Sequence, residues 1–399
     1  MKRFSWESIW LILLLTPCAL AGNEDVSALR ARAEAGDAKA QVEIGQIYAT
    51  GKGVEKDSLE AAGWYQKAAE NGNAIAQARL GIMFYRGDGV KQDNAASARW
   101  VRMAAEQGMA EAQNFLGLMY LEGVGVTKDS SAAAKWFRDA GMHGDVSAQY
   151  QLGLLLAKGD GVPKDSAESV IWYRKAAESG NAHAQFKLGL AYANGVGVTH
   201  SDAEAVKWFR AAAEQGIAMS QGYLGTMYYS GKGVARDDAE AIKWTQKAAE
   251  QGAASAQAFL GTLYDNSGVE GFKDSAKAAK WYRLAALQGS SVAQLNLGTL
   301  YYRGEGVAQD SSEAAKWFLL AAQQGDRDAQ RDLGILYYNG EGMPKSVVQA
   351  YVWNYLAAKQ GDEDAKKALA TLEDVLTSDQ KAKAMKEARV HFMNLQKKD

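Results

Sequence analysis

The sequence predicts an all-α protein: an α/α solenoid, a right-handed superhelix of antiparallel helix pairs with about 36 residues per repeat. Three columns of residues recur in phase. The tryptophans that follow residue 10 are spaced by 36, with one step of 37, at Trp64, Trp100, Trp136, Trp172, Trp208, Trp244, Trp281, Trp317 and Trp353. The same period brings back a glycine (Gly45, Gly81, Gly117, Gly153, Gly189, Gly225, Gly261, Gly298, Gly334) and a glutamine (Gln41, Gln77, Gln113, Gln149, Gln185, Gln221, Gln257, Gln294, Gln330). Three columns in phase over nine copies indicate tandem repeats of one small unit.

Each copy reads as two helices. In the second repeat, residues 76–84 place apolar groups at helical spacing. Gly87 and Gly89 then supply the positive-φ conformations that end a helix and turn the chain. An aspartate followed three residues later by a glutamate resembles a capping box that opens the second helix, as in Asp57–Glu60, Asp165–Glu168, Asp237–Glu240 and Asp310–Glu313.

The recurring glycine lies inside the first helix, where glycine costs about 1 kcal/mol relative to alanine. A cost of that size in every copy implies a steric need. We expect a close approach of the two helices of one pair, with the tryptophan of that pair beside Gly45 and its equivalents. A single pair cannot bury its apolar face alone, so neighbouring pairs stack.

The ends of the array differ from its interior. Residues 22–36 are expected to form an N-terminal capping helix and residues 37–361 the nine repeats. Residues 362–399 are expected to form C-terminal capping helices, the last of them opened by Thr377 together with Gln380.

Residues 1–21 read as a secretory signal peptide. Lys2 and Arg3 form a basic start, residues 9–15 are apolar, and Ala19 and Ala21 fit a cleavage site after Ala21. This pattern predicts export to the periplasm. Lipidation of Cys18, the one cysteine of the chain, is the alternative, and Pro17 disfavours it. No later segment is long and apolar enough to predict a membrane span.

The charge balance argues against a nucleic-acid partner. The formal net charge is −2, and a nucleic-acid surface would need a basic field.

The repeat pattern also resembles a known family. Ala-Gln-x-x-Leu-Gly-x-x-Tyr-x-x-Gly-x-Gly-Val-x-x-Asp-x-x-x-Ala-x-x-Trp-x-x-x-Ala-Ala-Glu-x-Gly is similar to the Sel-one-like repeat (SLR), a relative of the tetratricopeptide repeat, over residues 37–361. The resemblance implies an α/α solenoid that works as a binding scaffold or adaptor. Exported bacterial members include binders of host proteins, scaffolds of cell-envelope complexes and immunity proteins against delivered toxins. A disulfide-rich branch of the family does not fit a chain with the single Cys18.

Few residues suggest catalysis. The histidines His143, His183, His200 and His391 show no metal-ligand spacing, although His143 and His183 lie in neighbouring repeats. The Gly-x-Gly loops follow helices rather than strands, which favours turns over phosphate binding. No pair of carboxylates looks like a general acid and base. We therefore expect a protein that is not an enzyme and that needs no cofactor or metal.

The partner-binding face is expected on the first helices. In the related tetratricopeptide geometry these helices form the concave wall, which here comprises the columns of Val42, Gln46, Ala49 and Thr50. Apolar and aromatic residues in these columns are candidates for partner contact, because exposed apolar patches mark binding surfaces. The alternative is that they pack between adjacent first helices. The candidates are Tyr85, Leu118, Leu121, Tyr150, Leu154, Phe186, Leu190 and Tyr229.

These features predict a monomeric periplasmic or secreted scaffold that binds a partner protein, such as a toxin or a cell-envelope component, on its concave face. Two alternatives remain open from the sequence. One is an immunity protein that neutralises a delivered toxin. The other is a peptidoglycan- or polysaccharide-binding protein whose inner tyrosines stack on sugar rings.

Overall fold

The structure is a computed structural model that describes residues 26–265 and 271–396, and every regular element in these ranges is an α-helix. The helices form two compact units that divide between Ser201 and Asp202. Each unit is described by itself. The predicted signal peptide lies outside the described residues.

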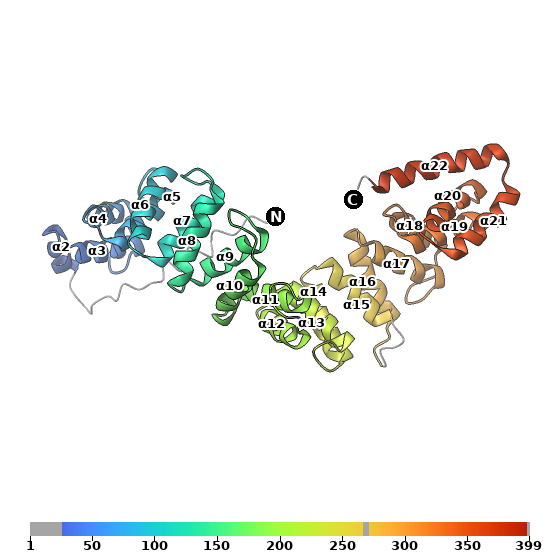
Figure 1. The fold of residues 1–399 in the computed structure, drawn as a ribbon, viewed down its shortest axis with the longest axis horizontal. Coiled ribbons are helices and arrows are strands. Elements are labelled where there is room, and N and C mark those ends of the chain that lie inside the picture. The colour runs from blue at the N-terminus through green and yellow to red at the C-terminus, as the bar shows by residue number, and fades with distance from the viewer. Residues whose placement is uncertain (1–25, 266–270, 397–399) are drawn as a thin grey trace. The chain divides into compact units, whose positions relative to one another are not determined.

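Unit 1 contains ten described helices (Figure 1): α2 Val26–Glu34, α3 Ala38–Thr50, α4 Ser58–Glu70, α5 Ala74–Arg86, α6 Asn94–Glu106, α7 Ala110–Glu122, α8 Ser130–Met142, α9 Val146–Lys158, α10 Ser166–Glu178 and α11 Ala182–Asn194. Unit 2 contains the rest: α12 Asp202–Glu214, α13 Ala218–Ser230, α14 Asp238–Glu250, α15 Ala254–Asp265, α16 Ser275–Leu287, α17 Ser291–Arg303, α18 Ser311–Ala322, α19 Arg327–Asn339, α20 Val347–Lys359, α21 Glu363–Val375 and α22 Ser378–Gln396.

Within each unit, helices that follow one another in the chain pack side by side, from α2 to α11 and from α12 to α21. The odd-numbered helices from α3 to α19 are the first helices of the repeats, and the even-numbered helices from α4 to α20 are the second helices. This arrangement confirms the predicted all-α repeat solenoid.

Glycine and aspartate set the helix ends as predicted. Gly51 ends α3 with φ 72°, and its N–H donates to the Ile47 carbonyl at 2.8 Å. The Asp57 side chain then opens α4 by accepting hydrogen bonds from the N–H groups of Leu59 and Glu60. A left-handed glycine followed by an aspartate cap therefore defines the turn in most of the pairs, and Ser346 replaces the aspartate before α20.

The glutamates of the expected capping boxes have a different partner. The backbone N–H of Asp165 donates to the Leu156 carbonyl at 3.0 Å, so it is already satisfied. The Glu168 side chain instead accepts a hydrogen bond from Nε1 of Trp172 at 3.1 Å, one turn further along α10. Glu240 does the same for Trp244 at 2.9 Å. The aspartate half of the predicted box is present. The two glutamates accept hydrogen bonds from the tryptophan column and from a basic side chain, Arg138 for Glu168 and Lys243 for Glu240.

The reciprocal box does form where the last helix begins. The N–H of Gln380 donates to Oγ1 of Thr377 at 3.3 Å, and the N–H of Thr377 donates to Oε1 of Gln380 at 3.0 Å.

Most glycines of the column meet an aromatic ring, but the ring is not the tryptophan expected from the sequence. It belongs to the residue that follows the tryptophan on the second helix. A Cβ on Gly117 would lie 2.7 Å from Cε1 of Phe137, and one on Gly153 would lie 2.7 Å from Tyr173. No real Cβ makes contacts this short, so glycine lets the two helices of a pair approach over a buried ring.

The glutamine column joins consecutive repeats. Nε2 of Gln77 donates to the Ala69 carbonyl at 3.1 Å, near the end of the preceding second helix. Nε2 of Gln107 donates in turn to Oε1 of Gln77 at 2.7 Å. The buried amide of Gln77 therefore connects the ends of α4 and α6. The column repeats this bond to the preceding helix at each described copy, for example at Gln149, Gln221 and Gln330.

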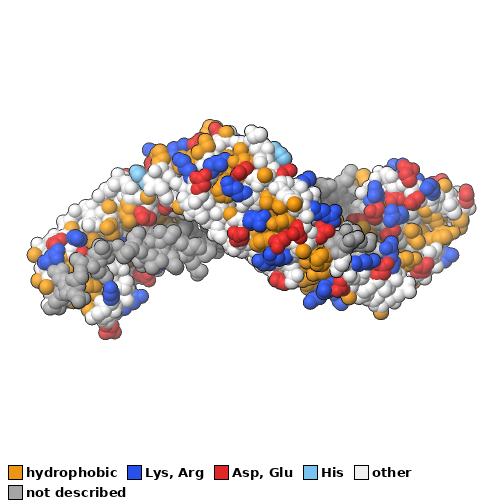
Figure 2. All heavy atoms as spheres, turned by 90° about the horizontal axis from the view of Figure 1, so that it is seen from below, with side chains coloured by type: hydrophobic (Ala, Val, Ile, Leu, Met, Phe, Trp, Pro, Cys, Tyr) orange, Lys and Arg blue, Asp and Glu red, His pale blue; other side chains and the backbone are white. Residues whose placement is uncertain are grey.

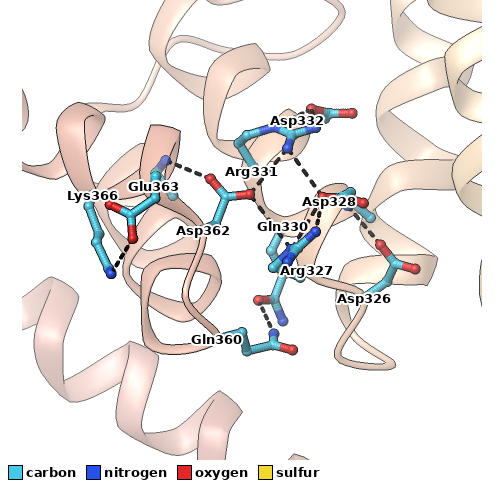
Figure 3. A network of polar contacts seen from close by, with 12 residues as sticks. Asp326, Arg327, Asp328, Gln330, Arg331, Asp332, Gln360, Asp362, Glu363 and Lys366 are labelled. Carbon is cyan, nitrogen blue, oxygen red and sulfur yellow. Dashed lines mark hydrogen bonds and ion pairs between the residues drawn. The ribbon is translucent and has the colours of Figure 1, made fainter.

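A polar network attaches the C-terminal helices to the ninth repeat (Figure 3). Arg331 on α19 donates to the Asp362 carboxylate at 3.1 Å, and Asp362 caps α21 through the Ala365 N–H. Burial raises the pKa of Asp362, but the Ala365 hydrogen bond and the Arg331 and Arg327 charges outweigh it, so the pKa is lowered. The last helix, α22, packs on α20.

The glycine contact can be tested with Gly117→Ala. We expect this variant to lower the free energy of unfolding by about 1–3 kcal/mol, because the new methyl group overlaps the Phe137 ring. Urea unfolding followed by circular dichroism measures the change. The matched control is Gly63→Ala in α4, where a Cβ has no neighbour within 4 Å. Here the higher helix propensity of alanine should stabilise by up to about 1 kcal/mol. Equal effects of the two variants would contradict the steric explanation.

Candidate functional site

The eight candidate residues have different degrees of burial. Leu118, Tyr150 and Phe186 are buried, with 5%, 8% and 5% of their surface exposed. The other five are half-buried: Tyr85, Leu121, Leu154, Leu190 and Tyr229. Seven of them belong to unit 1, and Tyr229 belongs to unit 2.

The expectation that the columns of Tyr150 and Leu118 face solvent is therefore wrong for these three residues. The Tyr150 ring lies 6.1 Å from the Tyr173 ring on α10 and 6.1 Å from the His183 ring on α11. Leu118 belongs to the core cluster that contains Phe137 and Leu152. These side chains fill the space between a pair and the next repeat, which is the alternative that the sequence left open.

The half-buried tyrosines each pack on a ring of the next first helix. Tyr85 meets Phe115 edge to face with ring centroids 5.8 Å apart. Within unit 2, Tyr229 meets Phe259 in the same way at 5.6 Å, and the Arg236 guanidinium lies over the Tyr229 ring. Such pairs stabilise the stacking of repeats and leave part of each tyrosine accessible.

Leu154 and Leu190 line a hollow of about 300 Å³ in unit 1. We call it the α9–α11 hollow, because its walls come from α9, α10 and α11 and from the loops that follow α9 and α11. Apolar and basic side chains share these walls, and the volume suits one or two side chains of another molecule. The lining residues are Leu154, Ala157, Lys158, Lys164, Ser166, Ser169, Val170, Tyr173, Lys187, Leu190, Ala191, Asn194 and Val196.

The floor of the hollow is neutral. Burial raises the pKa of Tyr173 to about 12, so its phenol keeps its proton at physiological pH. Ser169 beside it donates to the Gly153 carbonyl at 2.7 Å. Lys158, Lys164 and Lys187 supply the positive charge of the lining. These lysines were not among the residues predicted from the sequence, because they come from three different elements that only the packing brings together.

The buried carboxyl of Asp145 lies at the start of α9. It caps the helix by accepting from the Ala148 N–H at 2.7 Å. Burial raises the pKa of Asp145 to about 6; the Ala148 bond lowers it, and the Glu111 charge raises it further.

Unit 2 has two further hollows. One of about 300 Å³ lies between α13 and α15 beside Met219, Tyr223 and Phe259. Another of about 200 Å³ lies between α19, α20 and α21 beside Ile335, Tyr338 and Asn354. Neither contains a charged side chain in its lining.

Three of the histidines have separate partners. Nδ1 of His143 lies 3.2 Å from Oε1 of Gln113, the His183 ring contacts Tyr150, and the His391 ring contacts Trp353. Among the described residues no group of three or more His, Cys, Asp or Glu could hold a metal ion.

The surface carries charges of both signs. Figure 2 shows acidic and basic side chains interspersed over the face that it displays. No helix within residues 26–265 and 271–396 is long and apolar enough to span a bilayer.

A stack of helix pairs with hollows between its repeats defines the class of α/α repeat scaffolds. The Sel1 repeat matches nine consecutive segments of this chain, and the chain belongs to the Sel1 repeat family. The segments are residues 38–73, 74–109, 110–145, 146–181, 182–217, 218–252, 254–290, 291–326 and 327–362.

Two solved structures are similar over most of their length. One is a protective antigen present in uropathogenic Escherichia coli strains that displays an SLR fold, with 32% identity over 94% of this chain and 95% of that chain and a TM-score of 0.62. The other is a Sel1 repeat protein from Oxalobacter formigenes, with 34% identity over 82% of this chain and 93% of that chain and a TM-score of 0.59. A comparison with curated proteins found no match.

The raised pKa of Asp145 predicts a pH-dependent stability. A carboxyl whose pKa is higher in the folded than in the unfolded chain stabilises the fold below about pH 4, and this contribution is lost as pH rises through 6. Asp145→Asn keeps a capping side chain, as Asn73 and Asn181 do at the equivalent positions. It should raise the free energy of unfolding at pH 8 by on the order of 1–3 kcal/mol. The gain should vanish near pH 4, as followed by thermal melts.

Asp37→Asn is the matched control. Asp37 caps α3 from the same position, but the Arg32 hydrogen bond lowers its pKa. Its replacement should lower the melting temperature at pH 8. A shift of the same sign for both variants would show that burial of Asp145 does not govern its titration.

Proposed function

We propose that this protein is an exported scaffold that binds a partner protein on the first-helix face of unit 1. The α9–α11 hollow carries the proposal, because it offers partly exposed Leu154 and Leu190 beside unpaired positive charge. A rigid stack of repeats holds such a hollow open without ordering a loop, which lowers the entropic cost of binding. Belonging to a family of repeat scaffolds supports this function.

The hollow favours a protein partner over a glycan. Stacking on a sugar ring needs an exposed aromatic face. The one aromatic residue in the lining, Tyr173, has only 5% of its surface exposed. An aliphatic or carboxylate side chain fits the available leucines and lysines better.

Export is part of the proposal and rests on residues 1–21. The basic start, the apolar stretch and the Ala19-Leu20-Ala21 sequence place the cleavage after Ala21. The scaffold then works in the periplasm. Cleavage after Ala21 removes Cys18, so the mature chain contains no cysteine.

N-terminal sequencing of the protein purified from the periplasmic fraction tests the export. We expect a chain that begins at Gly22, because cleavage follows Ala21. Ala21→Pro is expected to block processing and leave the precursor in the membrane fraction. A mature chain that begins with a lipid-modified Cys18 would show that the exported scaffold is anchored to a membrane by its lipid. A full-length chain in the cytoplasm would refute export.

Site-specific photo-crosslinking in cells tests the partner. Tyr150 and Phe186 are unsuitable positions, because replacing buried rings would disturb folding together with binding. A photoreactive phenylalanine analogue at Leu190 should give an adduct with one partner protein. The same analogue at Leu59, which is 70% exposed on the second helix α4, is the control and should give none. No adduct at Leu190, or equal adducts at both positions, would refute the proposed binding face.

A further inference from the structure

Three lysines from three different elements line the α9–α11 hollow. Lys158 ends α9, Lys164 lies in the loop before α10, and Lys187 lies on α11. None of the three makes an ion pair within the part of the chain that the structure describes. Like charges around one small hollow repel each other, so the arrangement favours an anionic group between them.

Two of the acids near these lysines in the sequence, Asp165 and Glu168, are already engaged. A third, Asp160 in the loop after α9, is exposed and forms no ion pair with them among the described residues. Asp165 caps α10 by accepting from the Glu168 N–H at 2.9 Å. The Glu168 carboxylate accepts from Arg138 and from Nε1 of Trp172. The Arg138 bond lowers the pKa of Glu168, so this carboxylate stays charged and is paired with Arg138.

The repeat register shows that this cluster is specific to one place. Lys164 belongs to a column that is often basic, with Lys56, Lys128 and Arg236 at equivalent positions. Lys158 and Lys187 belong to mixed columns. Arg86 and Arg303 share the column of Lys158 and Arg79 shares that of Lys187, beside residues such as Glu122, Ser230, Glu43 and Phe115. Only the fourth and fifth repeats combine a basic residue at all three positions. The combination is therefore not a general feature of the repeat, and it distinguishes the α9–α11 hollow from the equivalent positions of the other repeats.

The remaining lining adds an apolar requirement. Leu154 and Leu190 are half-buried, and Val170 is buried beside them. A ligand that carried only charge would leave this apolar surface in water. A segment with an aliphatic side chain next to carboxylates would satisfy both the leucines and the lysines.

We propose that the α9–α11 hollow binds an acidic segment of the partner protein, in which an aliphatic side chain lies between aspartate or glutamate residues. This assignment rests on the proposed function and specifies the partner's chemistry. The lysines bind the carboxylates, and Leu154 and Leu190 bind the aliphatic group. Such an interface associates quickly at low ionic strength and weakens as salt screens the charges.

A pair of synthetic peptides tests the chemistry on the purified mature chain. The probe is fluorescein-labelled Gly-Asp-Leu-Glu-Leu-Asp-Gly, and its neutral counterpart is Gly-Asn-Leu-Gln-Leu-Asn-Gly. Fluorescence anisotropy should show the acidic peptide binding at least about tenfold more tightly than the neutral one, with an affinity that falls as salt rises. Equal affinities of the two peptides, or no binding of the acidic peptide, would overturn the proposal.

Charge reversal locates the site. Lys158→Glu/Lys187→Glu should weaken binding of the acidic peptide by about tenfold or more, because two attractive contacts become repulsive. The control Lys52→Glu/Lys91→Glu makes the same change in charge at exposed loop positions of unit 1 and should retain binding. Thermal melts check that both variants fold. An equal loss in both variants would mean that net charge, not the hollow, attracts the peptide.

The Leu190 crosslink separates the two proposals. If the adduct persists in the Lys158→Glu/Lys187→Glu variant, the proposal that the protein is a partner-binding scaffold stands, and the proposal that the partner presents an acidic segment is refuted. The opposite result is no adduct at Leu190 with all lysines intact, together with selective binding of the acidic peptide. It would support the specificity of the hollow for acidic segments and refute the proposal that it binds a partner protein in cells.

Discussion

The buried amide of the glutamine column is the interaction on which the stack depends. Gln77 donates to the Ala69 carbonyl of the preceding second helix and accepts from Gln107 of its own. Helix ends leave carbonyl groups without partners, and burying such a group unpaired costs about 1–3 kcal/mol. The glutamine satisfies this requirement at the junction of two repeats. This bond therefore fixes how consecutive repeats are aligned. The alignment in turn decides which side chains meet at a junction and where a hollow can form.

The glycine column sets the spacing inside each pair, whatever residue stands opposite it. Phe137 and Tyr173 are rings, but Val101 and Thr245 occupy the same column. A Cβ on Gly81 would still lie 2.6 Å from Cγ2 of Val101, and one on Gly225 would lie 2.2 Å from Oγ1 of Thr245. The close approach is thus a property of the helix backbones, and the opposing side chain adapts to it. A constant frame of this kind lets the surface residues vary from repeat to repeat.

The fold could be predicted from the sequence because its determinants are local and repeated. Gly51 and Asp57 act within one turn of their own positions, so spacing alone identifies them. The burial of Tyr150 could not be predicted in this way, because it depends on how far α11 approaches α10. A column can be assigned to the first helix from its period, but its exposure depends on the angle between successive pairs. The lysines of the α9–α11 hollow come from three elements, and only the packed structure brings them to one place.

The fourth repeat differs from its neighbours in the glutamine connection. Where Gln107 and Gln251 complete the bond in other repeats, the equivalent residue of the fourth repeat is Ser179. Oε1 of Gln149 is buried and has no hydrogen-bond partner among the described residues. An unmet acceptor lowers the free energy needed for local opening. The fourth repeat, which forms most of the α9–α11 hollow, therefore lacks a hydrogen bond that Gln107 and Gln251 supply in their own repeats, and this junction opens at a lower free-energy cost.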